Sequence, residues 1–184
     1  MGDIMHGFYL AIGRQGSGKT AFITKLLIDN YTKDKKVFSN YSLFGINYQK
    51  ITFDNKKNKN SLDILKIISD NPNYFNNSIM LLDEIHLYFD SRDFMKLNNR
   101  IIQNFFSQLR KRNILLLATT QYIMHLDIRI RRQALAVFQM TNLRDGIFRV
   151  DIHEIDGYFT RFLRSELVNL NDYFKYYDTN ELIE

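Results

Sequence analysis

The chain has 184 residues, enough for one compact domain and too few for two independent ones. Hydrophobic residues make up 45% and charged residues 24% of it, which are ordinary values for a globular protein. The absence of cysteine excludes disulfides, thiolate nucleophiles and thiolate zinc sites, and the formal net charge of +5 suits an anionic partner such as nucleic acid without identifying one.

The apolar segments are too short to cross a membrane. The longest purely apolar stretches, residues 79–82 and 114–118, fall far short of the roughly 18 residues that a spanning helix needs. The N-terminus has neither the basic nor the apolar region of a secretory signal. We therefore expect a single soluble, cytoplasmic domain over residues 1–184.

A strand, a glycine-rich turn and a helix open the predicted fold. Residues 8–12 form an apolar, aromatic run of strand length that breaks at Gly13. From Lys19 onward, apolar side chains recur at the spacing of an amphipathic helix. Residues 33–36 then predict a solvated connection, and residues 37–41 a second strand.

The middle of the chain predicts an irregular segment, a helix and a strand. Residues 43–60 are polar and show no clear period, which is typical of a mobile loop. Ser61 is a candidate cap for a helix that carries Leu62 and ends before residues 71–73. Residues 78–83 then form an apolar strand that ends in an acidic side chain.

A further helix and strand complete the pattern. Apolar side chains from Phe94 to Leu109 recur at helical spacing, and residues 110–112 supply the cations that suit a helix C-terminus. Residues 114–120 form another buried strand. Because strands that are apolar throughout alternate with helices, the sequence predicts a three-layer α/β domain with a mainly parallel central sheet.

The strongest motif is a phosphate-binding loop, G-x-x-x-x-G-K-[ST], between the first strand and the first helix. Its glycines let backbone N–H groups turn inward, so that the loop and the helix N-terminus form a cradle for the phosphates of ATP. Lys19 is expected to reach the β- and γ-phosphates, and the Thr20 hydroxyl to bind Mg²⁺. The predicted nucleotide-binding residues are Gly13, Arg14, Gln15, Gly16, Ser17, Gly18, Lys19, Thr20 and Ala21.

An acidic pair, Asp83 and Glu84, follows the apolar residues 79–82. Open α/β sheets bind their ligands at this carboxyl end of a strand. Asp83 is expected to hold Mg²⁺ through water, and Glu84 to polarise the attacking water as general base. The alternative is an acidic strand end in solvent. His86, just beyond, is more typical of a packing or capping residue than of a catalyst.

Polar and basic residues flank the last predicted strand. Gln121 is suited to sense the γ-phosphate; the alternative is a glutamine that only begins a loop. An arginine that stabilises transition-state charge is expected in the same region, from this subunit or from a neighbour. The candidates are Arg110 and Arg112 before the strand, and Arg129, Arg131 and Arg132 after it.

Taken together, these motifs resemble those of the FtsK–HerA superfamily of P-loop ATPases, and within it the zonula occludens toxin-like and viral genome-packaging ATPases. The resemblance rests on residues 13–20, 81–86, 109–112, 119–121, 126–129 and 177–181. Its most telling parts are the Thr-Thr-Gln and Tyr-Asp-Thr segments. It implies a RecA/ASCE-like fold and a ring-forming motor that hydrolyses ATP with Mg²⁺ to translocate DNA.

The resemblance also implies partners and a location. Zonula occludens toxin-like proteins usually carry a transmembrane helix and a further domain after the ATPase, and neither occurs by residue 184, which favours a compact viral packaging ATPase over a membrane-embedded extrusion motor. Capsid or vertex proteins are then expected partners, in the host cytoplasm or the virion. DNA contacts are expected to depend weakly on sequence and strongly on salt. Lys56, Lys57 and Lys59 are candidates for them; the alternative is a solvated surface loop.

Two other functions stay open. A small nucleotide kinase also begins with a phosphate loop, but a kinase must suppress attack by water, which a base at Glu84 and a sensor amide at Gln121 would promote. The other is a regulator that binds ATP only as a switch. The intact Lys19, Thr20 and Asp83 argue against such a loss of catalysis.

Overall fold

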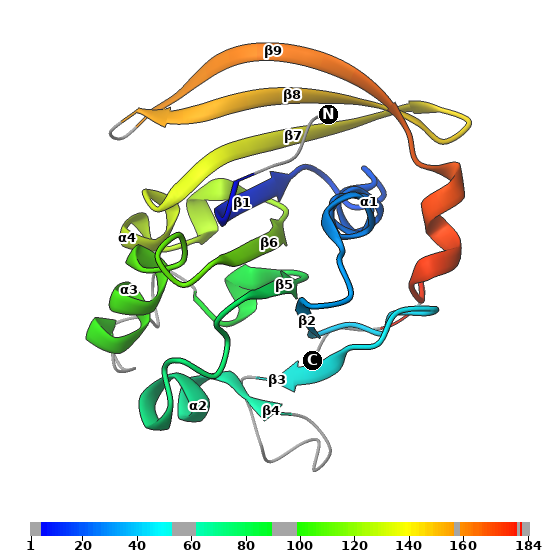
Figure 1. Cartoon of the computed structure of the whole chain (residues 1–184). Helices are drawn as coiled ribbons and strands as arrows, with labels where there is room; N and C mark the ends of the chain where they lie inside the picture. The colour runs from blue at the N-terminus through cyan, green and yellow to red at the C-terminus, as the bar shows by residue number, and fades with distance from the viewer. Residues whose placement is uncertain (1–4, 53–61, 90–98, 157–158, 180, 182–184) are drawn as a thin grey trace.

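A nine-stranded sheet organises the part of the chain that the computed structural model describes, residues 5–52, 62–89, 99–156, 159–179 and 181 (Figure 1). The strands lie in the order β4-β3-β2-β5-β6-β1-β7-β8-β9; neighbouring strands from β4 to β7 are parallel, and the β7–β8 and β8–β9 pairs are antiparallel. The strands are β1 (Gly7–Ile12), β2 (Lys36–Ser39), β3 (Gln49–Thr52), β4 (Leu62–Asp63), β5 (Ser78–Leu82), β6 (Ile114–Thr120), β7 (Ala134–Arg144), β8 (Ile147–Asp156) and β9 (Phe159–Asn169). The helices are α1 (Lys19–Asn30), α2 (Ile64–Asp70), α3 (Asn99–Ser107) and α4 (Ile128–Arg131), with short 3₁₀ helices η1 (Ile85–Leu87), η2 (Ile123–His125) and η3 (Asn171–Tyr176).

Helices cover both faces of the parallel strands. Every residue of β5 and β6 is buried, which is why these strands are apolar along most of their length. One apolar layer, with Phe75 and Phe106, packs beneath α2, α3 and α4. The other, with Phe22 and Phe138, packs beneath α1 and η3. The predicted three-layer α/β fold is thus confirmed. Within the described residues, no helix is both long and apolar enough to span a membrane.

Several predicted boundaries are wrong near the sheet edge. The irregular segment contains β3, whose Gln49 is exposed and Lys50 half-buried because β3 lies close to the edge of the sheet. Leu62 belongs to β4, and α2 begins only at Ile64. Asp63 is its cap, since its carboxylate accepts the Lys66 N–H at 3.1 Å. The predicted cap Ser61 and the lysines at 56, 57 and 59 lie outside the described residues.

Two other boundaries are shorter than predicted. The second strand ends at Ser39, and the described part of the long third predicted helix is α3, which ends at Ser107. Residues 108–113 form a turn that leads into β6, so the cations at 110–112 do not lie in the last turn of the helix. Phe94, the predicted start of that helical pattern, lies outside the described residues.

Three strands follow residue 132, for which the sequence analysis gives no prediction. β7 pairs with β1 and continues past it, because Ile12 at the end of β1 pairs with Gln139 in the middle of β7. Asp145 and Gly146 turn the chain into β8 with φ of 51° and 75°, as a two-residue hairpin requires. The β7–β8–β9 layer therefore extends beyond the end of β1 (Figure 1).

Candidate active site

The phosphate loop runs from Gly13 to Gly18, between the end of β1 and the start of α1. Gly18 has a φ of +82°, and a Cβ there would lie 2.6 Å from the Phe148 ring. Gly13 has a φ of +147°, and a Cβ there would lie 2.7 Å from the Met140 carbonyl oxygen. Only glycine lets the loop pass this close to the β7–β8 hairpin.

Cationic and N–H groups gather at the loop. Lys19 is 6% exposed, and its Nζ donates to the Arg14 carbonyl at 3.2 Å. The first hydrogen bond of α1 runs from the Phe22 N–H to the Gly18 carbonyl at 2.9 Å, so the N–H groups before Phe22 have no acceptor within the helix. A buried ammonium beside these donors suits a polyphosphate.

Thr20 and Asp83, the two residues predicted to bind Mg²⁺, contact each other in the structure. The Thr20 hydroxyl donates to both carboxylate oxygens of Asp83, at 3.1 and 3.2 Å. The Thr119 hydroxyl also donates to this carboxylate. Burial raises the pKa of Asp83, and the charge of Glu84 adds to the rise, although the Thr119 hydrogen bond opposes it. A divalent cation would stabilise the ionised form of Asp83, and the Thr20 and Asp83 oxygens are ligands that Mg²⁺ prefers.

Glu84 sits in a strained backbone conformation, with φ of 49° and ψ of 50°. Its N–H donates to the Thr119 hydroxyl at 2.9 Å, so Thr119 fixes both acidic residues. Its Oε2 lies 3.2 Å from His86 Nδ1, yet this buried oxygen has no hydrogen bond within the described part of the chain. Glu84 thus has His86 as its close neighbour, and a carboxylate after the end of β5 is a group that can accept a proton from water.

Gln121 lines a cavity of about 590 Å³ together with the phosphate loop. The walls also include Tyr122 and Met124 after β6, and Gln139–Asn142 of β7. Gln121 follows β6 and is half-buried. The structure thus brings Gln121 to the phosphate loop from a neighbouring strand, as a sensor would require.

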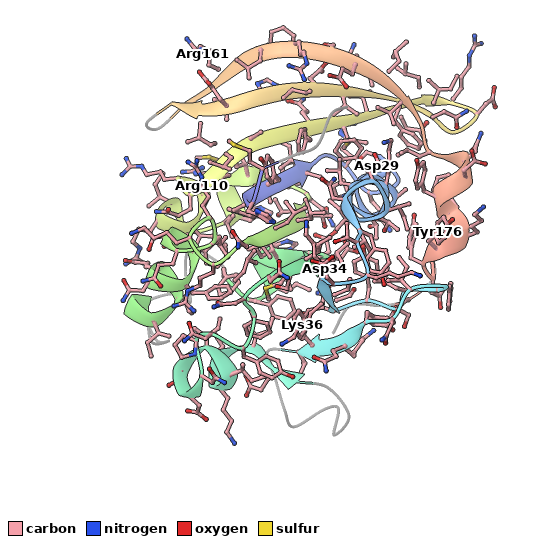
Figure 2. All side chains as sticks on the ribbon, viewed as in Figure 1. Asp29, Asp34, Lys36, Arg110, Arg161 and Tyr176 are labelled. Carbon is pink, nitrogen blue, oxygen red and sulfur yellow. The ribbon has the colours of Figure 1, made fainter. Side chains whose placement is uncertain are left out.

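One candidate arginine, Arg131, contacts the wall of this cavity, because its guanidinium donates to the Met124 sulfur at 2.7 Å. The contacts of Arg110, Arg112 and Arg129 lie elsewhere. Arg110 lies against Gly7 at the start of β1, at the opposite edge of the sheet from the loop (Figure 2). Arg112 donates to the Gln108 side chain and to the Pro72 carbonyl. The Arg129 guanidinium donates twice to Asp127, at 2.9 and 3.0 Å.

Neither Arg110 nor Arg112 contacts the phosphate loop of its own chain. The geometry therefore does not support a catalytic role for either residue at that loop. Both residues lead into β6, and parallel strands begin at the edge of the sheet opposite to their ligand edge. Arg131 is half-buried and Arg132 exposed around the end of α4.

Comparison with known proteins fits this geometry. The family model described as "Zonular occludens toxin (Zot)" matches residues 7–177. The chain belongs to the zonular occludens toxin family. The match confirms the resemblance to zonula occludens toxin-like ATPases that the sequence motifs indicate. A search of curated protein sequences gave no match.

Solved structures share the fold of this Zot-family chain at low sequence identity. The N-terminal domain of zonular occludens toxin from Neisseria meningitidis is 18% identical, with a TM-score of 0.72 over 95% of this chain and 100% of that one. B204, the DNA-packaging ATPase from Sulfolobus turreted icosahedral virus, is 16% identical, with a TM-score of 0.57 over 86% and 97%. The flagellar accessory protein FlaH from Methanocaldococcus jannaschii is 16% identical, with a TM-score of 0.58 over 89% and 85%.

Four site residues carry roles that the sequence analysis does not assign. Asn40 makes paired hydrogen bonds with the backbone of Asp83, at 2.9 and 2.8 Å. Thr119 bridges the acidic pair, Phe148 packs on the loop, and Asn142 donates to the Gly16 carbonyl at 3.3 Å. A polar residue after an apolar strand is the signal for Asn40 and Thr119. No comparable signal marks the other two.

Proposed function

We propose that this Zot-family chain hydrolyses ATP and uses the energy to move DNA, as one subunit of a ring. The P-loop NTPase fold and the family are established above. The observation that supports hydrolysis is the arrangement at the ends of β5 and β6, where Thr119 accepts the Glu84 N–H and donates to the Asp83 carboxylate, which itself accepts the Thr20 hydroxyl at the start of α1. The packaging role printed for B204 supports the DNA part of the proposal.

In the proposed hydrolysis, each step is assigned to a residue whose position the structure gives. Lys19 and the free N–H groups of α1 bind the β- and γ-phosphates. Mg²⁺, held by Thr20 and Asp83, would neutralise charge that develops on the phosphates. Glu84 takes a proton from the attacking water, and Gln121 orients that water or reports loss of the γ-phosphate. A kinase would have to exclude this water, so a carboxylate base at Glu84 favours hydrolysis over phosphoryl transfer to a second substrate.

Two kinds of DNA motor remain candidates. The viral packaging ATPase is the first, with capsid or vertex proteins as partners and the host cytoplasm or the virion as its location. The second is a phage assembly and extrusion motor of the zonula occludens toxin-like kind. The family match and the TM-score of 0.72 for the toxin domain, against 0.57 for B204, favour the second.

DNA-stimulated phosphate release tests the proposed function. We expect ATP hydrolysis by the purified chain to rise when DNA is added, and to fall back at high salt because phosphate contacts are screened. The measurement is the phosphate release rate with and without DNA, across a salt series. Hydrolysis that is unchanged by any DNA would contradict the motor, and transfer of phosphate to a nucleotide would establish a kinase instead.

A shared active site is the second expectation of the ring. Because Arg110 and Arg112 lie away from the loop of their own chain, either of them would act in catalysis only at the site of a neighbouring subunit. Mixing a Lys19→Ala subunit with an Arg110→Ala or Arg112→Ala subunit should restore part of the hydrolysis that each variant lacks alone. Phosphate release at fixed total protein measures the rescue.

The control is Arg161→Ala. Arg161 is an exposed arginine of β9 (Figure 2), so this variant should hydrolyse ATP on its own, without a second variant mixed in. The same mixing is repeated with variants of the other candidates, Arg129, Arg131 and Arg132. Failure of rescue for all five arginines would argue against sites shared between subunits.

A further inference from the structure

A second cavity lies away from the nucleotide site, around the connection from α1 into β2. It encloses about 310 Å³. Its lining combines three lysines, three tyrosines and two side-chain amides: Lys33, Lys35, Lys36, Tyr31, Tyr48, Tyr74, Asn47 and Gln49. Asp34 and Val37 complete it. Figure 2 labels Asp34 and Lys36 on this connection.

The cavity is separate from the chemistry proposed above. It lies at the start of β2 and beside the residues that enter β3, whereas the phosphate loop and the acidic pair follow the ends of β1 and β5. None of its lining residues is shared with the cavity beside the phosphate loop. A ligand here would therefore not compete with ATP.

The charge of the cavity favours an anion. The lining carries three lysines and one carboxylate, Asp34, which lies between Lys33 and Lys35 in sequence and already accepts a hydrogen bond from the Thr32 side chain. Lys33 and Lys36 are exposed, so their ammonium groups can reach a ligand in the opening. Phosphate groups are anions of this kind, and lysine is a frequent binder of them.

The aromatic walls favour a ring. Tyr74 is fixed in place, because its hydroxyl donates to Gln49 at 3.2 Å and Lys36 Nζ lies 5.4 Å from its ring centroid. Tyr31 and Tyr48 are half-buried, so each shows part of its ring to the cavity. Asn47 is exposed and adds an amide donor and acceptor, and Gln49 adds its amide N–H groups; such groups read base edges.

We propose that this cavity binds one nucleotide of a single-stranded nucleic acid, with its base against the tyrosines and its phosphates at the lysines. The proposal rests on the function proposed above and names the form of DNA that it engages. A duplex keeps its bases stacked inside and offers only its backbone, so tyrosines would add nothing to duplex binding. A single strand can turn a base out into a cavity of this size.

The test is binding of a fluorescent oligonucleotide without ATP, measured by anisotropy over a salt series. Lys33→Ala combined with Lys36→Ala should reduce the salt slope for single-stranded DNA by about 1.4, from about 0.7 per phosphate contact on a single strand. Lys66→Ala combined with Lys111→Ala, which removes two exposed lysines outside the cavity, should leave the slope near wild type. An equal effect of the two double variants would overturn the proposal.

A pair of variants at Tyr48 separates stacking from charge. Tyr48→Ala should weaken single-strand binding roughly 10-fold, as loss of one base stack does, while Tyr48→Phe keeps the ring and the affinity. Circular dichroism checks that each variant folds. If Tyr48→Ala does not fold, the lysine variants alone test the proposal.

The outcomes distinguish this proposal from the proposed function. If the wild-type chain binds neither single-stranded nor duplex DNA, the motor itself is contradicted. If wild type binds DNA and the cavity variants bind equally well, only the cavity is excluded. If single-strand and duplex affinities fall by the same factor, the lysines act as a general backbone contact and the single-strand site is wrong.

Discussion

Replacing Glu84 by glutamine should lower ATP turnover by roughly 10²-fold or more while ATP still binds. The amide has nearly the shape of the carboxylate but cannot take a proton from water. Because the Glu84 N–H to Thr119 hydrogen bond involves the backbone, the variant keeps the local conformation. Phosphate release at saturating ATP and the dissociation constant of a non-hydrolysable analogue, measured together, give the two quantities.

A matched control for Glu84→Gln is Glu166→Gln on β9. Glu166 pairs with Arg164 and lies outside the site, so the same chemical change there should leave turnover near wild type. The general-base role of Glu84 fails if Glu84→Gln hydrolyses ATP as fast as the control. A loss of analogue binding in Glu84→Gln would instead indicate that Glu84 contributes to holding the nucleotide.

Replacing Lys19 by alanine should abolish the stabilisation of the fold by nucleotide. An analogue at 100 times its dissociation constant stabilises a protein by about 2.7 kcal/mol. For a domain of this size that corresponds to a rise in Tm of about 5–10 °C. Lys19 is buried, and its ammonium group donates a hydrogen bond to the Arg14 carbonyl. No carboxylate pairs with it among the described residues, so its charge is available to phosphate. Thermal unfolding with and without Mg²⁺ and analogue measures the loss.

Lys25→Ala provides the comparison within the same helix. Lys25 is half-buried and forms an i,i+4 ion pair with Asp29 away from the phosphate loop, an interaction worth little to stability. Its variant should show the full rise in Tm with analogue. A full rise in Lys19→Ala as well would mean that Lys19 does not contact the phosphates.

The sequence predicts those parts of the site that depend on local pattern. Residues 13–20 adopt the loop because the spacing of their glycines fixes the backbone, and the apolar runs before Asp83 and Gln121 identify buried strands. The partners of Asp83 could not be predicted in the same way. Asn40 reaches Asp83 only because β2 pairs with β5, and that pairing is a property of the whole sheet.

The arginine and cap assignments show the other limit of local pattern. Residues 109–112 are close in sequence to β6, but Arg110 lies at the start of β1, whereas the phosphate loop follows the end of β1. Ser61 and Asp63 are both good capping residues. Because Leu62 of β4 pairs with Ile51 of β3, the helix α2 begins only after Asp63, which is its cap. The hairpin after β7 did have a local signal: Asp145-Gly146 precedes alternating apolar and polar residues in β8.

The position of β1 in the middle of the sheet also sets the order in which the protein can fold. Phe8 of β1 pairs with Leu116 on one side and with Ala134 on the other, so the first strand to leave the ribosome has no neighbour until most of the chain has been made. Closing such long loops before any contact forms is slow. Until then, the apolar surface of β1 and α1 is open to other chains, which makes dependence on chaperones during synthesis a consequence of this strand order.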